Sequence, residues 1–327
     1  MNGQFFETVH GPHVVKAASG FLHFMKYATG DASLDAVCDE QRDLGFNEVR
    51  VFLGIKGGLG DFDPRPHLDK LPGFCKYMAK KKLRIEFTHG DWKRWCPDPA
   101  DQKQLLHDEE QAILPYAAWT QIEGMNEGDH LDNYAAGIVP ETLDQAVLWC
   151  LGSRIQDAGT MVPVKRWASY HPSRTKDWPR KVGHNCMEVA DKHKMPAKSN
   201  ECKRPDEDGY KVSNFFDAAA NASLLCAGAC FHYASGKSSV LMSAQERQCA
   251  EAWVEGANAV PLGYRYGKYT AGHLHDSPVE YRPGKWSHAR LLGNKACVSV
   301  PQNPDGWIPK NGWHVVWQNQ TVIELEK

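Results

Sequence analysis

The chain has 327 residues and a mass of 36.7 kDa, which is enough for one large domain with an appendage. Hydrophobic residues make up 42% and charged residues 24%, so the composition excludes an intrinsically disordered chain. The formal net charge of -2 leaves no excess of positive charge for nucleic acid or anionic lipid, and we expect neither nucleic-acid nor membrane partners.

No segment has the roughly 18 consecutive apolar residues that a membrane span requires. Residues 1–20 also lack the basic stretch and apolar core of a Sec signal peptide. We therefore expect a soluble protein that is cytoplasmic, virion-associated or secreted as a processed form. The ten cysteines form no CxxC pair, so we expect mostly buried thiols. We expect no cofactor and no metal, and the sequence leaves the oligomeric state open.

Between residue 14 and about residue 260, short β-type runs alternate with segments of helical periodicity, a pattern typical of successive βα units around a parallel sheet. In chain order, the runs predict strands at 14–25, 47–55, 83–92, 119–127, 161–172, 196–201 and 229–236. The helical periodicity predicts helices at 33–45, 67–82, 101–117, 140–159, 182–194, 213–228 and 243–260.

This count predicts an α/β fold, a (β/α)8 TIM barrel, with one strand short or hidden between residues 128 and 170. A doubly wound sheet is the alternative, but no GxGxxG or GxxxxGK[ST] motif follows any predicted strand. We assign the barrel catalytic domain to residues 1–260. Residues 261–327 have alternating β-formers and many turn residues, which indicate a small C-terminal β appendage packed on the barrel.

Polar side chains lie at or near the end of the predicted strands. In a barrel of parallel strands these ends converge on one face, so we expect the side chains to surround a single cleft. In chain order, they are His23, Arg50, His89, Asp91, Trp92, Asn126, Glu127, Tyr170, His171, Asn200, Glu201, His232 and Tyr233.

Two of these residues, Glu127 and Glu201, suit the hydrolysis of a glycosidic bond. That reaction needs one carboxyl group to protonate the leaving oxygen and a second to attack the anomeric carbon or activate water. A carboxyl separation of roughly 5 to 5.5 Å gives retention of configuration, and roughly 6.5 to 9.5 Å gives inversion. A neighbouring arginine such as Arg50 favours the ionised form of a carboxylate.

The ordered segments NEVRV (47–51), THGDW (88–92), GMNE (124–127), SYHP (169–172) and PAKSNE (196–201) resemble the clan A glycoside hydrolases of the cellulase and mannanase type. The resemblance covers roughly residues 14 to 260. It implies that Glu127 is the acid/base and Glu201 the nucleophile of a retaining hydrolase of a poly- or oligosaccharide. It also implies that Asn126 binds the sugar 2-hydroxyl, that Arg50 supports the nucleophile, and that Tyr170 and His171 orient it.

We place further substrate contacts at His89, Trp92, His232 and Tyr233, because they end the third and last predicted strands. Two alternatives stay open. A metal-dependent barrel hydrolase of the amidohydrolase or deacetylase kind would use imidazole and carboxylate ligands, but the first strand has no HxH motif and the chain has no HExxH motif. Its candidate ligands are His23, His89, Asp91, His130, His171 and His232. The other alternative is a carbohydrate-binding barrel without catalysis, such as a phage or surface adhesin.

Overall fold

A computed structural model describes most of the chain. The described residues are 6–8, 11–57, 59–127, 134–137, 147–150, 153–155, 166–175, 177–271, 274–280, 287–300, 308–310, 312–319 and 322–327. His130, one of the candidate metal ligands, lies outside these ranges. None of the helices in the described part of the chain is long and apolar enough to cross a membrane. All ten cysteines are described, and each is a buried free thiol, as the sequence predicts.

The main sheet is a nearly closed barrel of parallel strands. Its strands are β3 (Val15–Ser19), β4 (Glu48–Phe52), β5 (Arg84–Thr88), β6 (Thr120–Glu123), β7 (Leu148–Cys150), β8 (Ser153–Ile155), β9 (Ala168–His171), β10 (Ala197–Ser199) and β11 (Gly228–Phe231). They have the order β7-β6-β5-β4-β3-β11-β10-β9-β8, in which β7 and β8 are the two ends and do not pair with each other. β11 pairs with β3, so the last strand returns to the first. This order confirms the (β/α)8 barrel and excludes the doubly wound alternative.

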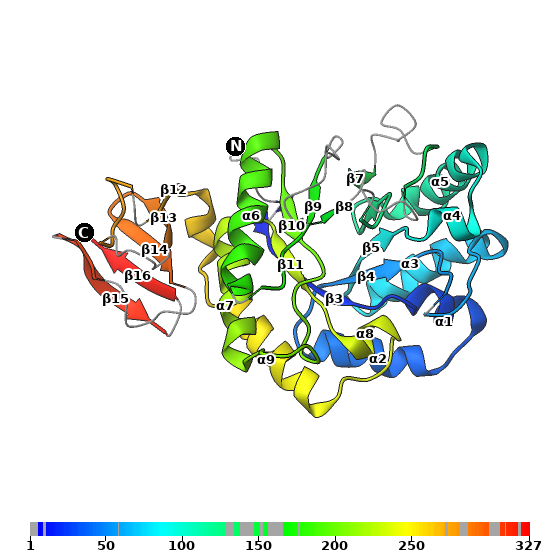
Figure 1. Cartoon of the computed structure of the whole chain (residues 1–327), viewed down its shortest axis with the longest axis horizontal. Helices are drawn as coiled ribbons and strands as arrows, with labels where there is room; N and C mark the ends of the chain where they lie inside the picture. The colour runs from blue at the N-terminus through cyan, green and yellow to red at the C-terminus, as the bar shows by residue number, and fades with distance from the viewer. Residues whose placement is uncertain are drawn as a thin grey trace.

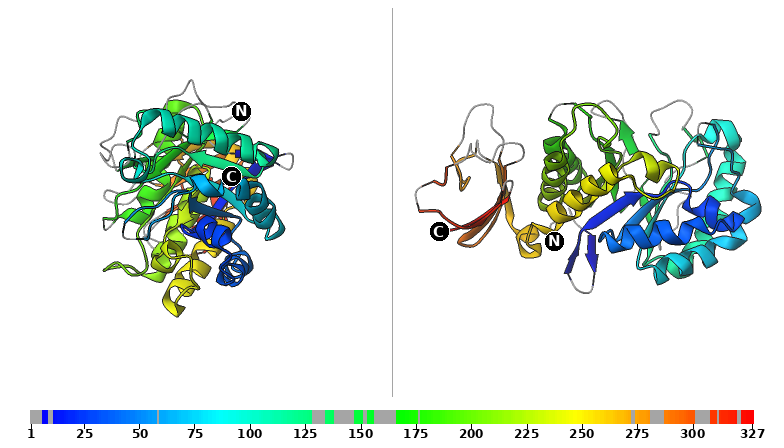
Figure 2. Two further views of the ribbon diagram at one scale, coloured as in Figure 1. Left: turned by 90° about the vertical axis from the view of Figure 1, so that its right-hand side faces the viewer. Right: turned by 90° about the horizontal axis from the view of Figure 1, so that it is seen from below.

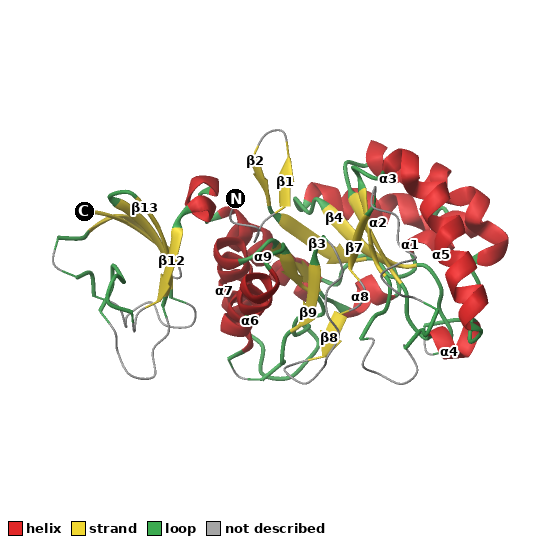
Figure 3. Cartoon of the chain, turned by 90° about the horizontal axis from the view of Figure 1, so that it is seen from above, coloured by secondary structure: helices red, strands yellow, loops and turns green. Residues whose placement is uncertain are grey.

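Helices surround the barrel strands (Figure 3). They are α1 (His23–Thr29), α2 (Ser33–Asp43), η1 (Arg65–Lys70), α3 (Leu71–Lys80), α4 (Trp92–Trp95), α5 (Pro99–Ile113), η2 (Leu114–Tyr116), α6 (Trp178–His193), α7 (Val212–Leu225), α8 (Ala234–Lys237), α9 (Ala244–Asn258) and η4 (Leu262–Tyr266). Local signals start two of these helices: Asp98 caps α5, and Ser243 forms a capping box with Glu246 at α9.

The fifth barrel position is where the sequence prediction fails in part. A hidden strand between residues 128 and 170 is confirmed, because β7 pairs with β6 and β8 pairs with β9 on either side of residues 151–152. The predicted helix at 140–159 is wrong for 148–150 and 153–155, which are strands, and residues 140–146, 151–152 and 156–159 lie outside the described ranges. Its short apolar run fits a helix and a buried strand equally well, and the pairing of each piece with one neighbouring strand decides the outcome. The first strand is also shorter than predicted, since α1 already begins at His23.

Within the barrel strands, apolar and polar side chains alternate. In β4, Val49 and Val51 belong to the core shared with the surrounding helices, and the intervening Arg50 is fully buried on the inner side. Lys198 of β10 binds Glu48 of β4, although these strands are not neighbours. The contact therefore crosses the barrel, whose interior contains charged groups as well as apolar ones.

The C-terminal segment forms a separate antiparallel sheet with the order β12-β13-β14-β16-β15. Its strands are β12 (Lys268–Ala271), β13 (His288–Leu292), β14 (Lys295–Ser299), β15 (His314–Gln318) and β16 (Val322–Glu326). Figures 1 and 2 show it at one end of the molecule, beside α6 and α7. A domain boundary at residue 260 stays a prediction, between the end of α9 and the start of β12. A hairpin of β1 (Phe6–Thr8) and β2 (Gly11–His13) precedes the barrel.

The sheet contacts α7 through apolar and charged groups. Phe216, Ala220 and Leu224 recur every four residues on α7 and pack against a cluster that includes Cys297 and Val322 of the sheet. The guanidinium of Arg290 donates hydrogen bonds to the Leu224 carbonyl (3.2 Å) and the Leu225 carbonyl (3.1 Å). These carbonyls belong to the last turn of α7, which has no later helical N–H groups to bind them.

We predict that Arg290→Met lowers the free energy of unfolding by about 2–4 kcal/mol, because it leaves buried carbonyls unpaired. Urea denaturation measures the change. Arg290→Lys keeps the charge but has fewer hydrogen-bond donors, so its free energy of unfolding should lie between those of wild type and Arg290→Met. Arg42→Met, at an exposed ion pair on α2, is the control and should leave the midpoint nearly unchanged. A wild-type midpoint for Arg290→Met would contradict this role.

Candidate active site

Glu127 and Glu201 follow β6 and β10 at the carboxyl ends of these strands. Both have left-handed backbones, with φ angles of 47° and 48°. A non-glycine residue in this region costs about 1–2 kcal/mol. Such strain is found most often where a side chain must point in a required direction. Here it occurs at both glutamates that the sequence selects.

The two carboxylates meet at His171, the last residue of β9. One ligand atom from each of Glu127, His171 and Glu201 lies within 4.8 Å of the other two. His171 Nδ1 is 3.0 Å from Glu127 Oε1 and 3.9 Å from Glu201 Oε2. The separation is therefore far below the 10 Å or so beyond which two carboxyl groups cannot act on one glycosidic bond, and it is close to that of retaining enzymes.

Arg50 holds the inner side of this site. Its Nη1 donates to Glu201 Oε1 at 2.6 Å, and its Nη2 donates to Glu123 Oε2 at 2.6 Å and to Asn126 Oδ1 at 2.7 Å. The Arg50 side chain is fully buried, so these contacts replace the water that a guanidinium otherwise binds. One cation thus sets the positions of a strand-end carboxylate and of the amide beside Glu127.

The charges around Glu201 determine its protonation. Burial acts to raise the pKa of Glu201, but the charges of His171 and Arg50 outweigh it and hold the pKa well below its usual value. For His171, burial lowers the pKa, and the charge of Glu201 together with the hydrogen bond to Glu127 outweighs it and raises the pKa. Glu201 is consequently ionised at neutral pH, which is the state that its predicted role requires.

Four other residues of the predicted ring lie apart from this pair. His89 Nε2 bonds to Glu109 Oε2 (2.6 Å), and Trp92 stacks on His89 and donates to the Gly124 carbonyl (2.9 Å). Further partners are Asn185 for the Tyr170 hydroxyl (2.9 Å) and Gln41 for the Tyr233 hydroxyl (2.9 Å). All four side chains are buried, and Trp92, Tyr170 and Tyr233 belong to the apolar core shared with the helices, so their role as substrate contacts stays a prediction that their burial does not favour.

His232 interacts electrostatically with one member of the pair, Glu201. Burial is nevertheless the largest influence on the pKa of His232 and lowers it to about 3. The ring Nδ1 is 2.9 Å from the Ser19 hydroxyl. A neutral His232 beside Glu201 can offer a hydrogen bond without adding charge.

Sequence reasoning missed Arg174, which lies just after β9. Its Nη2 is 3.7 Å from Glu201 Oε2, its Nε donates to the Glu201 carbonyl (3.3 Å), and its Nη1 binds Glu207 (2.9 Å). The side chain is 37% exposed, so it forms part of the open side of the site. Its only sequence signal is its place two residues after the segment SYHP.

The sequence predicts no role for Glu123, but its Oε2 accepts two hydrogen bonds from Arg50, from Nε at 3.1 Å and from Nη2 at 2.6 Å. The interior below it continues the same pattern: Lys198 Nζ binds Glu48 Oε1 at 2.5 Å and also contacts Glu86. Burial raises the pKa of Glu86 to about 7, against the opposing effect of Lys198. The signal was available, since charged residues alternate with apolar ones in EVRVF and RIEFT.

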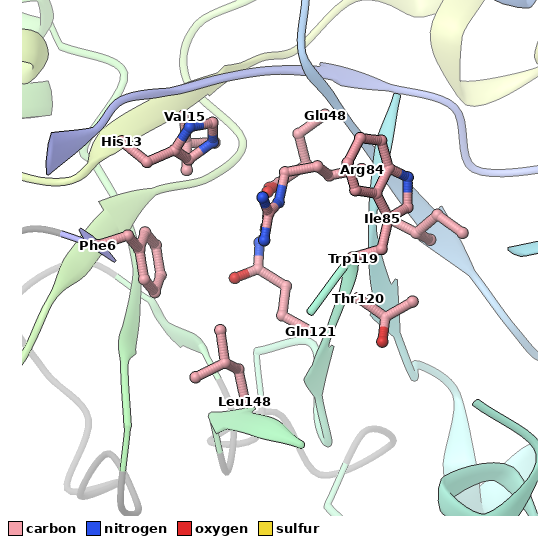
Figure 4. A pocket seen from close by; sticks show the side chains of 10 residues that line it. All are labelled: Phe6, His13, Val15, Glu48, Arg84, Ile85, Trp119, Thr120, Gln121 and Leu148. Atoms are coloured by element: carbon pink, nitrogen blue, oxygen red, sulfur yellow. Dashed lines mark hydrogen bonds between the residues drawn. The ribbon is translucent and has the colours of Figure 1, made fainter. Parts of the chain in front are cut away.

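A small cavity of about 50 Å³ lies at the other end of the barrel, where the strands begin (Figure 4). His13, Glu48, Arg84 and Gln121 line it together with apolar side chains. It is far too small for a sugar chain, and none of the strand-end residues contributes to it. We therefore do not assign the candidate active site to this end of the barrel.

The metal-hydrolase alternative finds little support in the described residues. His23 is buried in α1 and bonds to Ser239 and Gln41 (2.7 and 3.0 Å), and His89 bonds to Glu109. Within the described ranges, the group that could hold an ion is again Glu127, His171 and Glu201. Since Glu201 already binds the Arg50 guanidinium, a metal ion there would meet a neighbouring positive charge.

No protein-family model and no curated protein sequence matches this chain. Solved structures do match its fold. Exo-beta-1,4-mannosidase Op5Man5 from Opitutaceae bacterium strain TAV5 has a TM-score of 0.54 and 13% identity over 79% of this chain, and the match spans only 62% of that chain. A GH5-4 broad specificity endoglucanase from Clostridium longisporum has a TM-score of 0.54 and 9% identity, and the match covers 76% of this chain and 97% of its own.

A glycoside hydrolase family 5 structure from Bacteroides vulgatus matches 99% of this chain and 93% of its own, at a TM-score of 0.54 and 10% identity. At such identities the likeness establishes the fold alone. The barrel is therefore of the type found in family 5 glycoside hydrolases, which agrees with the clan A resemblance of the strand-end motifs.

We predict that Lys198→Met destabilises the protein by ~3–5 kcal/mol, because it leaves Glu48 and Glu86 buried without their cation. Denaturant titration at neutral pH measures this change. Lys198→Met combined with Glu86→Gln should recover part of the loss, since fewer buried charges stay unpaired. Lys194→Met, at an exposed ion pair, is the control and should leave stability nearly unchanged. Equal stability of wild type and Lys198→Met would show that the ion pair has no such role.

Proposed function

We propose that this protein is a retaining glycoside hydrolase that cleaves a poly- or oligosaccharide. The observation that supports it most is the approach of Glu127 and Glu201 within 4.8 Å at one mouth of the barrel. The fold is also that of structures whose names describe a mannosidase and an endoglucanase. We infer a neutral β-linked hexose chain as the substrate class, by analogy with those two names.

In the proposed reaction, ionised Glu201 attacks the anomeric carbon while the bond to the leaving oxygen breaks. Glu127 gives its proton to that oxygen, and a glycosyl-enzyme ester with Glu201 results. Glu127, now a carboxylate, then takes a proton from water as the water oxygen attacks the same carbon. The ester bond breaks and Glu201 is released, so the two inversions restore the original configuration.

The neighbours of the pair have distinct proposed tasks. Arg50 and His171 keep Glu201 ionised. Their positive charges also make the Glu201 carboxylate a weaker nucleophile, but the positive charge that develops on the sugar in the transition state attracts that carboxylate. Because Asn126 Oδ1 accepts a hydrogen bond from Arg50, its amide nitrogen is the group that meets the sugar 2-hydroxyl. Such a contact strengthens in the transition state and contributes to kcat as well as to binding.

We expect Glu127→Gln and Glu201→Gln each to lower kcat/KM by roughly 10³-fold or more on oligosaccharides. On an aryl glycoside with a good leaving group, azide should rescue Glu127→Ala and Glu201→Ala, whose short side chains leave room for the azide ion. The azide product should have the retained configuration with Glu127→Ala and the inverted one with Glu201→Ala, because azide replaces water in the first and the nucleophile in the second. NMR of the products measures the configuration.

Glu188→Gln, at an exposed position of α6, is the control and should keep wild-type turnover. Unchanged melting temperatures would show that the folds are intact. Near-wild-type activity of either glutamine variant, or inversion by the wild type, would overturn the mechanism. Sugar binding without turnover of any glycoside would favour the non-catalytic carbohydrate-binding barrel.

The pH profile gives an independent test. The charge of His171 helps to lower the pKa of Glu201, so His171→Asn should raise that pKa. Activity falls as the pH drops through the pKa of the nucleophile. The acid limb of kcat/KM should therefore move to higher pH, by roughly one unit for an opposite charge at this distance. His107→Asn, on the exposed side of α5, should leave the limb in place. A shift to lower pH would contradict the assignment.

A further inference from the structure

A groove of about 740 Å³ lies between the barrel helices and the C-terminal sheet. None of its lining residues belongs to the site described above. α9 contributes most of one side, and Trp317 and Asn319, at and just after the end of β15, form the other. Its volume is in the range of sites that bind ligands of several rings.

Trp317 faces this groove because of a β-bulge. The register between β15 and β16 shifts so that Val315 lies opposite Leu325, whereas Trp317 lies opposite the adjacent Glu324. One extra residue, Val316, is thus inserted into β15. A bulge of this kind reverses the alternation of side chains and redirects the next one.

The side on which Trp317 lies follows from its partner across the sheet. Glu324 accepts a hydrogen bond from the Tyr264 hydroxyl (2.6 Å), and Tyr264 belongs to the cluster that joins the sheet to α7. Leu325, opposite Val315, belongs to the separate cluster on the other side of the sheet. The bulge therefore places the Trp317 indole on the barrel side of an edge strand, where it is 44% exposed.

The other lining groups are suited to hydroxyl groups. Glu251, Glu255 and Asn258 lie on exposed positions of α9, and Phe216 and Val254 provide an apolar floor. No lysine or arginine is among the lining residues, although Lys16 bonds to Asn258 and Arg42 bonds to Asp43 at its edge. The carboxylates of Asp43, Glu251 and Glu255 outnumber these two cations, so the groove favours a neutral ligand over phosphate, nucleic acid or an acidic sugar.

The amide oxygens of Asn258 and Asn319 already accept hydrogen bonds from Lys16 and from the Val322 N–H, so the acceptors for a ligand are the carboxylates of α9. An indole face beside carboxylate acceptors matches a neutral sugar ring, which has an apolar face and hydroxyl donors at its edge.

We propose that this groove is a second carbohydrate site, in which a neutral β-linked glycan chain stacks on Trp317 and its hydroxyl groups bind the acidic face of α9. The choice of glycan rests on the proposed function, but the binding itself does not require catalysis. The site would hold a long substrate on the enzyme between cleavage events.

Binding is tested with cellohexaose and mannohexaose by isothermal titration calorimetry, in the Glu201→Gln background so that neither probe is consumed. The parent protein should show two sites for at least one of these probes. Adding Trp317→Ala should weaken one site by about tenfold or more, which corresponds to ~1.4 kcal/mol, and leave the other unchanged. Tyr266→Ala, an equally exposed aromatic outside the groove, is the matched control and should keep both sites.

The proposal is overturned if the Glu201→Gln parent binds neither probe, or if Trp317→Ala weakens none of the sites that the parent shows. Sedimentation velocity tests whether the exposed edge strand β15 instead pairs with a second copy of the chain. A wild-type dimer that Trp317→Ala converts to a monomer would assign β15 to pairing with a second copy instead. The hydrolysis of a small aryl glycoside by Trp317→Ala should equal that of wild type. If wild type hydrolyses no glycoside, the proposed function fails, whereas the calorimetry still decides the groove.

Discussion

The buried guanidinium of Arg50 is the contact on which the rest of the site depends. It reaches Glu123 in β6, Asn126 just beyond that strand, and Glu201 beyond β10. These segments are far apart in sequence, and an uncompensated cation in this place would cost several kcal/mol. The barrel therefore closes around Arg50 only when the strand ends are in their proper register. The same requirement brings Glu201 to the mouth in its ionised form.

The barrel interior contains a second buried cation with carboxylate partners. This cation, Lys198, binds Glu48 and Glu86 one layer below Arg50, where many barrels have branched apolar side chains. Salt bridges of this kind add little net stability compared with apolar packing, but breaking one is costly. They thus specify which strands face each other across the barrel more than they strengthen it. The left-handed backbones of Glu127 and Glu201 cost free energy, and the packing of the surrounding barrel offsets this cost.

The C-terminal sheet is joined to the barrel by a similar combination. Apolar residues of α7 pack against it, and Arg290 binds the carbonyls that end this helix. The junction leaves the open groove at Trp317 to one side. A rigid attachment would keep a glycan bound there at a constant distance from the barrel, which is the geometry that a second binding site needs to raise the local concentration of substrate.

The alternation of strands and helices, and the polar residues at strand ends, were sufficient to predict the barrel and the glutamate pair. Two features exceeded the reach of the pattern. The fifth strand consists of two three-residue pieces, and an apolar run of that length has no period of its own until its neighbours pair with it. The charge network likewise joins residues whose sequence separation hides their contact.

The sequence predicts that both members of pairs such as Tyr170-His171 and His232-Tyr233 surround the cleft. Successive side chains on a strand point to opposite faces, so only one member of each pair can face the barrel interior. In both pairs it is the histidine, and the tyrosine lies among the helices. Local chemistry in the chain thus determines which residue types stand at the mouth of the barrel. Which of two neighbours enters the site is decided by the register of the closed sheet, because that register alone assigns each side chain to a face.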